Sequence, residues 1–252
     1  MWLLLAFLVA AFVHAAAGLG GGSSYTALLS LAGWPPAPLK VLSRVCNLLV
    51  TAQGCWQFWR HGHWRGRWAW PFLVASVPLA FLGGMTPISA EGFRAVLAVG
   101  LGFSGLLLFF EKAPDSGPDR SHLASAAQRW LVGLALGGGV GYGAGLAAIG
   151  GGIFLAPVLH ALRWGQPKEI ASLASAFIFA NSLAGLLGQA VQGDWAGPPS
   201  EGFWWLPGVV LVGGFLGSRC GASWFSQRLV KRWTGGLVFL VALRLGWEVL
   251  FG

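Results

Sequence analysis

The chain has 252 residues, of which 56% are hydrophobic and only 10% are charged, and its mean hydropathy is +0.67. A soluble domain carries about 25% charged residues, so this composition excludes a water-soluble enzyme and indicates an integral membrane protein. The net charge of +8 does not indicate nucleic-acid binding, because the basic residues lie between continuous apolar runs, as in the loops of helical membrane proteins.

Ten apolar segments follow one another along the chain, and their continuous rather than alternating hydrophobicity predicts helices. Six of them are about 20 residues or longer, which is enough to cross a hydrocarbon core of ~30 Å at ~1.5 Å per residue. The other four form two short pairs, residues 2–17 with 22–33 and residues 129–144 with 150–162, each pair joined by a glycine-rich break. The long segments are residues 37–59, 68–87, 92–111, 168–190, 203–225 and 232–251.

The two halves of the chain resemble each other at an offset of about 130 residues, and such internal duplication is typical of transporters. The matching positions are Leu19–Gly22 with Ile149–Gly152, Pro36 with Pro167, Gly54 with Gly185, and His61–Trp64 with Gln192–Trp195. This duplication predicts a first transmembrane repeat over residues 1–112, a cytoplasmic linker over residues 113–128, and a second transmembrane repeat over residues 129–252.

Equivalent loops of the two halves have opposite charge. The loop after residues 37–59 contains Arg60, Arg65 and Arg67, whereas its counterpart after residues 168–190 contains only acidic charges. By the positive-inside rule, the halves are therefore inserted in opposite senses. Eleven of the 16 Lys and Arg residues then lie in or beside cytoplasmic loops, at residues 60–67, 112–128, 163–168 and 226–232.

The expected fold class is therefore an all-α integral membrane protein with two inverted repeats. Each repeat is predicted to contain a glycine-broken short helix pair followed by three full transmembrane spans. The first segment has no basic leader and has a counterpart later in the chain, so we interpret it as a retained helix rather than a signal peptide.

Each glycine-rich break is predicted to start a helix whose N-terminus can bind an anion. Three successive glycines disfavour a helix by about 1 kcal/mol each relative to alanine, and in lipid the freed backbone groups cannot remain unpaired. The N–H groups of the restarting helix carry partial positive charge, and inverted halves would bring the two breaks together near the midplane. The alternative is that the glycines serve close helix packing. The candidate residues are Gly20, Gly21, Gly22, Gly150, Gly151 and Gly152, with Ser23 and Ser24 as hydroxyl donors.

Arg44 lies about seven residues into the segment 37–59, where a charge is costly and is usually paired or functional. One role is a counter-charge to the anion, because a guanidinium can contact an oxyanion through two parallel hydrogen bonds. The other role is snorkelling to the interface or capping of a carbonyl group of the broken helix. The sequence leaves both roles open.

Other polar residues lie in the spans that follow each break. Ser175 and Asn181 are the preferred candidates for the substrate site, ahead of Asn47, Gln53 and Ser182. Such residues more commonly form hydrogen bonds between membrane helices, so this remains the alternative for all of them. No spacing of histidine, cysteine or acidic residues predicts a metal site, and no cofactor is expected.

Several of these motifs together resemble the sulfite exporter TauE/SafE family over residues 2–251. The resemblance is carried by the duplicated Gly-Gly-Gly helix starts, by Ser43-Arg44-Val45 after Pro36, and by Ala174-Ser175-Ala176 followed by Asn181–Gly185. It implies a multi-pass permease of the bacterial inner membrane that moves a sulfur-containing anion, such as sulfite, thiosulfate or an organosulfonate.

We therefore expect a secondary transporter, not an enzyme, that binds a small sulfur-containing anion near the midplane between two helix N-termini. An anion channel or a transporter of a non-sulfur organic anion is the alternative. An intramembrane enzyme is a distant alternative, because Ser23 and Ser24 lie in no Gly-x-Ser-x-Gly motif. The expected partners are the anion and the lipid bilayer but no nucleic acid; a coupling ion, H+ or Na+, and a homo-oligomer remain open.

Overall fold

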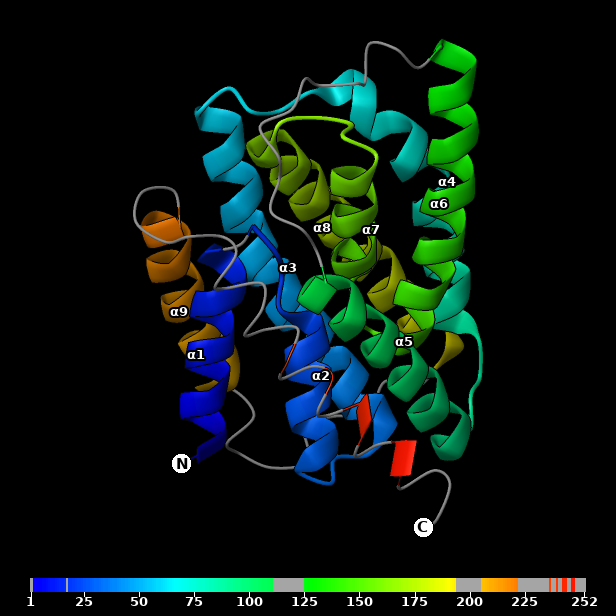
Figure 1. Cartoon of the computed structure of the whole chain (residues 1–252). Coiled ribbons are helices and arrows are strands. Elements are labelled where there is room, and N and C mark those ends of the chain that lie inside the picture. The colour runs from blue at the N-terminus through cyan, green and yellow to red at the C-terminus, as the bar shows by residue number, and fades with distance from the viewer. Residues whose placement is uncertain are drawn as a thin grey trace.

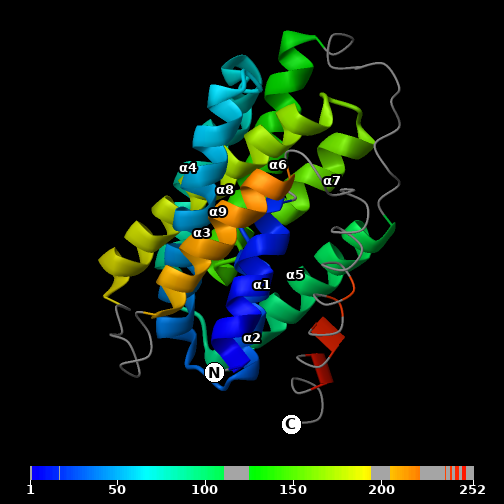
Figure 2. The ribbon, with the colours of Figure 1, turned by 90° about the vertical axis from the view of Figure 1, so that its left-hand side faces the viewer.

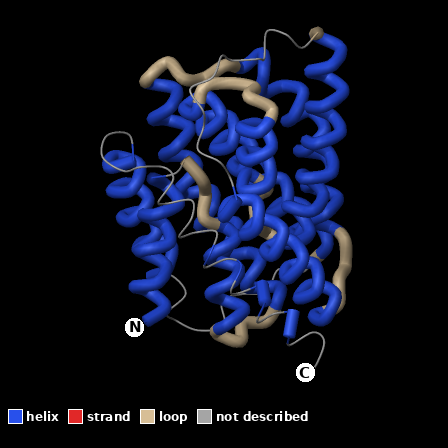
Figure 3. The backbone as a smooth tube through the Cα atoms, viewed as in Figure 1, coloured by secondary structure: helices blue, strands red, loops and turns tan. Residues whose placement is uncertain are grey.

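The structure, a computed structural model, describes residues 2–16, 18–110, 125–193 and 205–221 and a few positions between 236 and 247. All regular secondary structure in these ranges is helical (Figure 3). Most of the expected linker and most of the expected segment 232–251 lie outside the described residues. The helices are α1 (Trp2–Ala16), α2 (Gly22–Leu31), α3 (Pro36–Arg60), α4 (Gly66–Met85), α5 (Ala90–Phe110), α6 (Ala126–Ala147), α7 (Gly152–Ala161), α8 (Pro167–Gln192) and α9 (Trp205–Gly221).

Helix α6 begins earlier than the sequence predicted and is longer than a short segment. Ser125 and Gln128 form a capping box, in which Gln128 N donates to Ser125 Oγ at 3.1 Å and Ser125 N donates to Gln128 Oε1 at 2.9 Å. The helix therefore starts within the stretch predicted to be linker and reaches 22 residues. Together with α4 and α8, α6 is one of three described helices that are long and apolar enough to cross a membrane.

The two short helices each reverse the direction of the helix before them. In Figure 1, α1 rises from the lower end and α2 returns downward, whereas α6 descends from the upper end and α7 returns upward. The reversals pass through left-handed backbone, with φ of 87° at Gly21, 81° at Gly150 and 80° at Gly151, which residues with a side chain rarely adopt. Each pair is therefore a hairpin that enters the bundle and leaves it at the same end.

Glycines allow the helices of the two halves to approach closely. On α6, Gly137 and Gly145 face α4 so closely that an added Cβ would overlap the carbonyl oxygen atoms of Phe72 and Ala80. On α9, a Cβ at Gly213 would lie 2.6 Å from the carbonyl oxygen of Leu8 in α1. Such backbone contacts are typical of membrane helices, and here they join α6 to α4 and α1 to α9.

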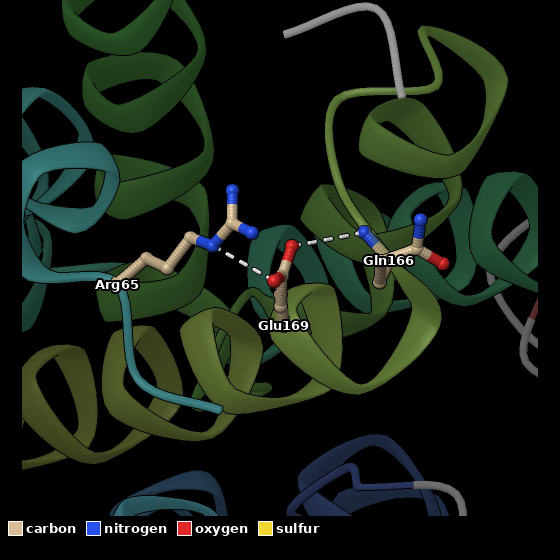
Figure 4. Close-up of polar contacts among 3 residues, drawn as sticks. All are labelled: Arg65, Gln166 and Glu169. Carbon is tan, nitrogen blue, oxygen red and sulfur yellow. Dashed lines mark hydrogen bonds and ion pairs between the residues drawn. The ribbon is translucent and has the colours of Figure 1, made fainter. Parts of the chain in front are cut away.

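Apart from the two glycine breaks, the described loops lie at the two ends of the bundle. Residues 61–65 and 162–166, which the sequence places on the cytoplasmic side, both lie at the upper end in Figures 1 and 3. The loop at 86–89 lies at the lower end, and Figure 2 shows the same separation from the side. An ion pair between Arg65 and Glu169 joins the first of these loops to the first turn of α8 at 2.8 Å (Figure 4).

Candidate functional site

The two glycine breaks meet in the interior of the bundle. A Cβ added at Gly22 would lie 2.8 Å from the carbonyl oxygen of Ile149, so the backbones of the two breaks are in direct contact. Ser43 of α3 links them further, because its Oγ lies 3.1 Å from both Gly22 O and Ala148 O. The Oγ1 of Thr26 lies 2.8 Å from the same hydroxyl. The starts of α2 and α7 are therefore held beside each other by α3.

Ser175, one of the two preferred candidates, holds the first break from the opposite side. Its Oγ lies 3.1 Å from Gly18 O and 2.9 Å from Ala171 O, within donating distance of both carbonyls. The hydroxyl proton is therefore committed to backbone oxygen atoms. Each long helix thus fixes the break of the other half, α3 through Ser43 and α8 through Ser175.

No N-cap side chain caps the start of α2 or of α7. Gly21 and Gly151 occupy the N-cap positions, neither offers a side-chain acceptor, and neither helix carries an acidic residue in its first turn. The N–H groups of a first helical turn have no acceptor within the helix. Two sets of such groups, each at the positive end of a helix dipole, therefore open toward the same region.

Asn47 fills the space between the two breaks. Its Oδ1 would lie 2.7 Å from a Cβ at Gly20, its Nδ2 would lie 2.9 Å from a Cβ at Gly150, and a Cβ at Gly22 would overlap the same amide. The side chain is fully buried, and neither amide atom has a hydrogen-bond partner among the described residues. Leaving a buried polar atom unpaired costs about 1–3 kcal/mol. This amide therefore needs a partner that the described residues do not provide.

Asn181, the other preferred candidate, is in the same condition. It is buried, and both of its amide atoms lack partners among the described residues. The neighbouring Ser182 is also buried with an unpartnered Oγ, which would lie 3.5 Å from a Cβ at Gly150. Unpartnered polar side chains therefore follow each break, on α3 in the first half and on α8 in the second.

The hydroxyl candidates at the start of α2 differ in their contacts. Ser24 Oγ lies 2.8 Å from Nε2 of His14 in α1, so this hydroxyl is already paired inside the protein. Ser23 is buried at the same helix start. Tyr25 has a buried, unpartnered hydroxyl that would lie 2.8 Å from a Cβ at Gly21, while its ring stacks on Phe7 at 5.0 Å.

Arg44 is fully buried and points to the end of α6 that leads into the second break. Its Nη2 donates to Gly145 O, and its Nη1 donates to Oε1 of Gln189 on α8. The amide of Gln189 donates in turn to Ala37 O at 3.0 Å. A positive charge at a helix C-terminus is favourable, and this contact corresponds to the carbonyl-capping role among the two that the sequence left open.

Comparison with known proteins decides the family. The family model described as sulfite exporter TauE/SafE matches residues 3–245. The chain belongs to the sulfite exporter TauE/SafE family. It is also 30% identical over 250 residues to the probable membrane transporter protein y4hK of Sinorhizobium fredii, with 97% of each chain covered. No solved structure matches the chain. The predicted family is confirmed, and the chain is a membrane protein of a transporter family.

In this TauE/SafE protein, two buried residues lie at the breaks without being preferred candidates of the sequence analysis. They are Asn47, a candidate of lower rank than Asn181, and Tyr25. A signal for Asn47 was present, because Ser43, Asn47 and Thr51 recur every four residues and therefore share one face of α3. For Tyr25 the available signal was its position directly after the glycine and serine run.

Proposed function

We propose that the protein is a secondary transporter that binds a small sulfur-containing anion, such as sulfite, thiosulfate or an organosulfonate, between the starts of α2 and α7. One observation carries the proposal: the buried, unpartnered amide of Asn47 lies between two helix N-termini. Either feature alone would fit a packing role. Together, the amide and the two helix N-termini provide hydrogen-bond donors without an acceptor among the described residues, at the positive ends of two helix dipoles.

The chemistry of the site favours an anion over a cation. Helix N-termini present only N–H groups and partial positive charge, and glycine allows a ligand to approach the backbone. The Asn47 amide and the Tyr25 hydroxyl add side-chain donors, and no acidic residue occurs in the first turn of α2 or α7. We assign the binding role to the glycines of both breaks, Ser23, Asn47 and Asn181, and supporting roles to Arg44 and Ser175.

We further propose that the two halves are inverted repeats around this site. Reciprocal contacts support the proposal. A Cβ at Gly54 would lie 2.9 Å from Ser175 Oγ, and a Cβ at its counterpart Gly185 would lie 3.0 Å from Arg44 Nε, with Arg44 and Ser175 separated by the same offset. The opposite directions of corresponding helices in Figure 1 also support an inverted arrangement.

Apolar side chains cover the proposed site toward both ends. Phe72 near the upper start of α4 and Leu159 near the upper end of α7 belong to one buried cluster. Leu39 near the lower start of α3 and Phe93 near the lower start of α5 belong to another. In the proposed mechanism, one repeat rocks against the other so that these clusters open in turn and expose the anion to one side at a time. The upper end faces the cytoplasm of a bacterial inner membrane.

The test is transport in proteoliposomes loaded with sulfite, thiosulfate, methanesulfonate, phosphate or acetate. We expect saturable exchange of the sulfur anions and at least tenfold slower exchange in Asn47→Ala. The matched control is Ser76→Ala, because Ser76 Oγ is also buried and unpartnered but lies against Gly141 of α6. Equal loss in both variants, or transport of none of the sulfur anions, would refute the proposal. Non-saturating flux would indicate a channel, and preferred exchange of acetate would indicate a non-sulfur substrate.

A further inference from the structure

His14, in the last turn of α1, is a buried titratable side chain that contacts the start of α2. Only 2% of it is exposed, and its Nε2 lies 2.8 Å from the Oγ of Ser24 in the first turn of α2. The other ring nitrogen, Nδ1, is buried and has no hydrogen-bond partner among the described residues. The imidazole is therefore linked to the proposed anion site and has one ring nitrogen whose bonding the described residues leave unsatisfied.

The surroundings of His14 make its charge depend on whether an anion is bound. Without an anion, an imidazolium would be buried with no counter-charge beside the positive end of the α2 dipole, and both effects favour the neutral imidazole. An anion at the start of α2 supplies the missing counter-charge. The negative end of the α1 dipole, where His14 lies, then also favours the imidazolium.

Carboxylates do not compete with His14 for a proton in the described interior. The only carboxylates among the described residues are those of Glu91 and Glu169, and both lie in the first turn of a helix at an end of the bundle. The described helices that pack against α1 are α2, α3 and α9, and none of the three contains an aspartate or a glutamate.

The other titratable and charged groups on these three helices differ from His14 in position or chemistry. Tyr25 and Cys46 lie in one buried cluster with Phe7 of α1, and both are neutral groups that lose rather than gain a proton. Arg219 of α9 is exposed, with its guanidinium over the ring of Phe215 at 5.1 Å. The remaining cations of α3 lie elsewhere along that helix: Lys40 near its lower start, Arg44 toward α6 and α8, and Arg60 at its exposed upper end.

Protonation of His14 would turn the Ser24 hydroxyl toward the anion. In the neutral imidazole, Nε2 either accepts the hydroxyl proton of Ser24 or donates to its oxygen, depending on the tautomer. In the imidazolium both ring nitrogens donate, so Ser24 Oγ must accept from Nε2 and its own proton must find another acceptor. An anion at the start of α2 is such an acceptor. The proton on His14 and the anion therefore each favour the binding of the other.

We propose that His14 carries a proton that moves together with the anion, so that the protein is a proton–anion symporter. This inference rests on the proposed anion site and names its coupling ion. The proton enters from the side to which the site is open, binds the imidazole as the anion binds, and leaves with the anion on the other side. No covalent bond other than that of the proton forms or breaks.

The first test counts the protons taken up when methanesulfonate binds to the purified full chain in detergent. Methanesulfonate is the probe because it stays ionised between about pH 5 and pH 8, the range in which a histidine titrates, so any proton taken up goes to the protein. Calorimetry in two buffers of different ionisation enthalpy should show uptake that approaches one proton per anion. The affinity should rise by up to about tenfold for each unit by which the pH falls, the limit for one linked proton. Binding without proton uptake would overturn the inference without any variant.

His14→Gln should bind methanesulfonate without proton uptake, because an amide nitrogen can donate to Ser24 Oγ but gains no proton in this pH range. Its affinity should therefore not change with pH. The matched control is His61→Gln, since His61 is exposed in the loop after α3 and should leave proton uptake unchanged. Proton uptake that persists in His14→Gln, or that is lost equally in His61→Gln, would contradict the inference. A purely structural role of His14 would change stability but not the number of protons.

Ser24→Ala tests the hydroxyl and retains His14. In this variant the affinity for methanesulfonate should rise less steeply as the pH falls, because no hydroxyl proton can turn to the anion. An unchanged rise would overturn the route through Ser24.

Transport separates this inference from the proposed function. Proteoliposomes in a more acidic medium should accumulate methanesulfonate through the unmodified protein, whereas His14→Gln should exchange methanesulfonate without accumulating it. If the unmodified protein exchanged methanesulfonate but a pH gradient drove no accumulation, the inference would fail and the proposed function would stand. If it neither bound nor moved methanesulfonate or thiosulfate, the proposed function would fail and the inference with it.

Discussion

Asn47 and Ser175 both lie buried beside a glycine break, yet alanine should affect stability in opposite directions at the two positions. The amide of Asn47 has no partner among the described residues, so its removal relieves a penalty of about 1–3 kcal/mol. The void left by the amide costs less than about 1 kcal/mol at ~24 cal/mol per Å³. Asn47→Ala should therefore stabilise the ligand-free protein by about 1 kcal/mol.

Ser175→Ala removes a hydroxyl that contacts Gly18 O at 3.1 Å and Ala171 O at 2.9 Å. The carbonyl of Gly18 then loses this donor inside the bundle, at a cost of about 1–3 kcal/mol. For a chain of this length each kcal/mol shifts the unfolding midpoint by about 2–4 °C. The two variants should thus differ by at least about 4 °C.

The assay is thermal unfolding of both variants in one detergent, with and without sulfite. Without sulfite, Asn47→Ala should unfold at a higher temperature than the unmodified protein, and Ser175→Ala at a lower one. Sulfite should raise the midpoint of the unmodified protein and of Ser175→Ala but not that of Asn47→Ala. A lowered midpoint for Asn47→Ala would mean that its amide is paired within the protein, and the reasoning from an unpartnered donor would be refuted.

Three further predictions concern packing, the buried charge and the orientation. Gly137→Ala should destabilise the protein by about 1–3 kcal/mol, because its Cβ would overlap Phe72 O, whereas Gly139→Ala, with open space around it, should be neutral or slightly stabilising. Midpoints of thermal unfolding measure both. Arg44→Ala should reduce the yield of folded protein, since two buried charge-assisted hydrogen bonds are lost, and Arg44→Lys should recover part of it; gel filtration of detergent extracts checks this. His61→Cys and Ser89→Cys should react with a membrane-impermeant thiol reagent from opposite sides, with His61→Cys protected in intact cells; the reverse pattern would refute the assigned orientation.

The order of helices and the two breaks could be predicted from the sequence because they depend on local chemistry. Pro36 and Pro167 mark the starts of α3 and α8, where a missing N–H costs nothing. The glycine runs mark the breaks because glycine adopts the left-handed backbone of Gly21, Gly150 and Gly151 without steric cost, although Ala148 in the second break also has a positive φ of 58°. The early start of α6 was missed although Ser125 and Gln128 have the spacing of a capping box, because the polar composition of that stretch favoured a linker.

The side chains that face the breaks could not be ranked from the sequence, because their ranking depends on the rotation of α3 about its axis. Ser43 and Asn47 share the face of α3 toward the breaks. Arg44 directly follows Ser43 and therefore lies about 100° around the helix, where it points to α6 and α8. A charged residue in an apolar segment is easily recognised in a sequence, but helix packing determines which face of α3 lies toward the breaks. The neutral amide, not the guanidinium, lies between the two helix starts.

The side chains at the proposed site differ between the two halves of the chain. At the offset that pairs Gly54 with Gly185, Asn47 corresponds to Ile178, and both contact the Cβ positions of Gly20 and Gly150. The proposed anion therefore meets an amide from one half and an apolar methyl group from the other. An oxyanion with acceptor atoms on every side, such as sulfate, would leave one of them unpaired against Ile178, whereas methanesulfonate can place its methyl group there. Transport should accordingly favour methanesulfonate over sulfate, and Ile178→Asn should reduce that preference about tenfold or more in a competition assay; an unchanged ratio would mean that Ile178 does not face the substrate.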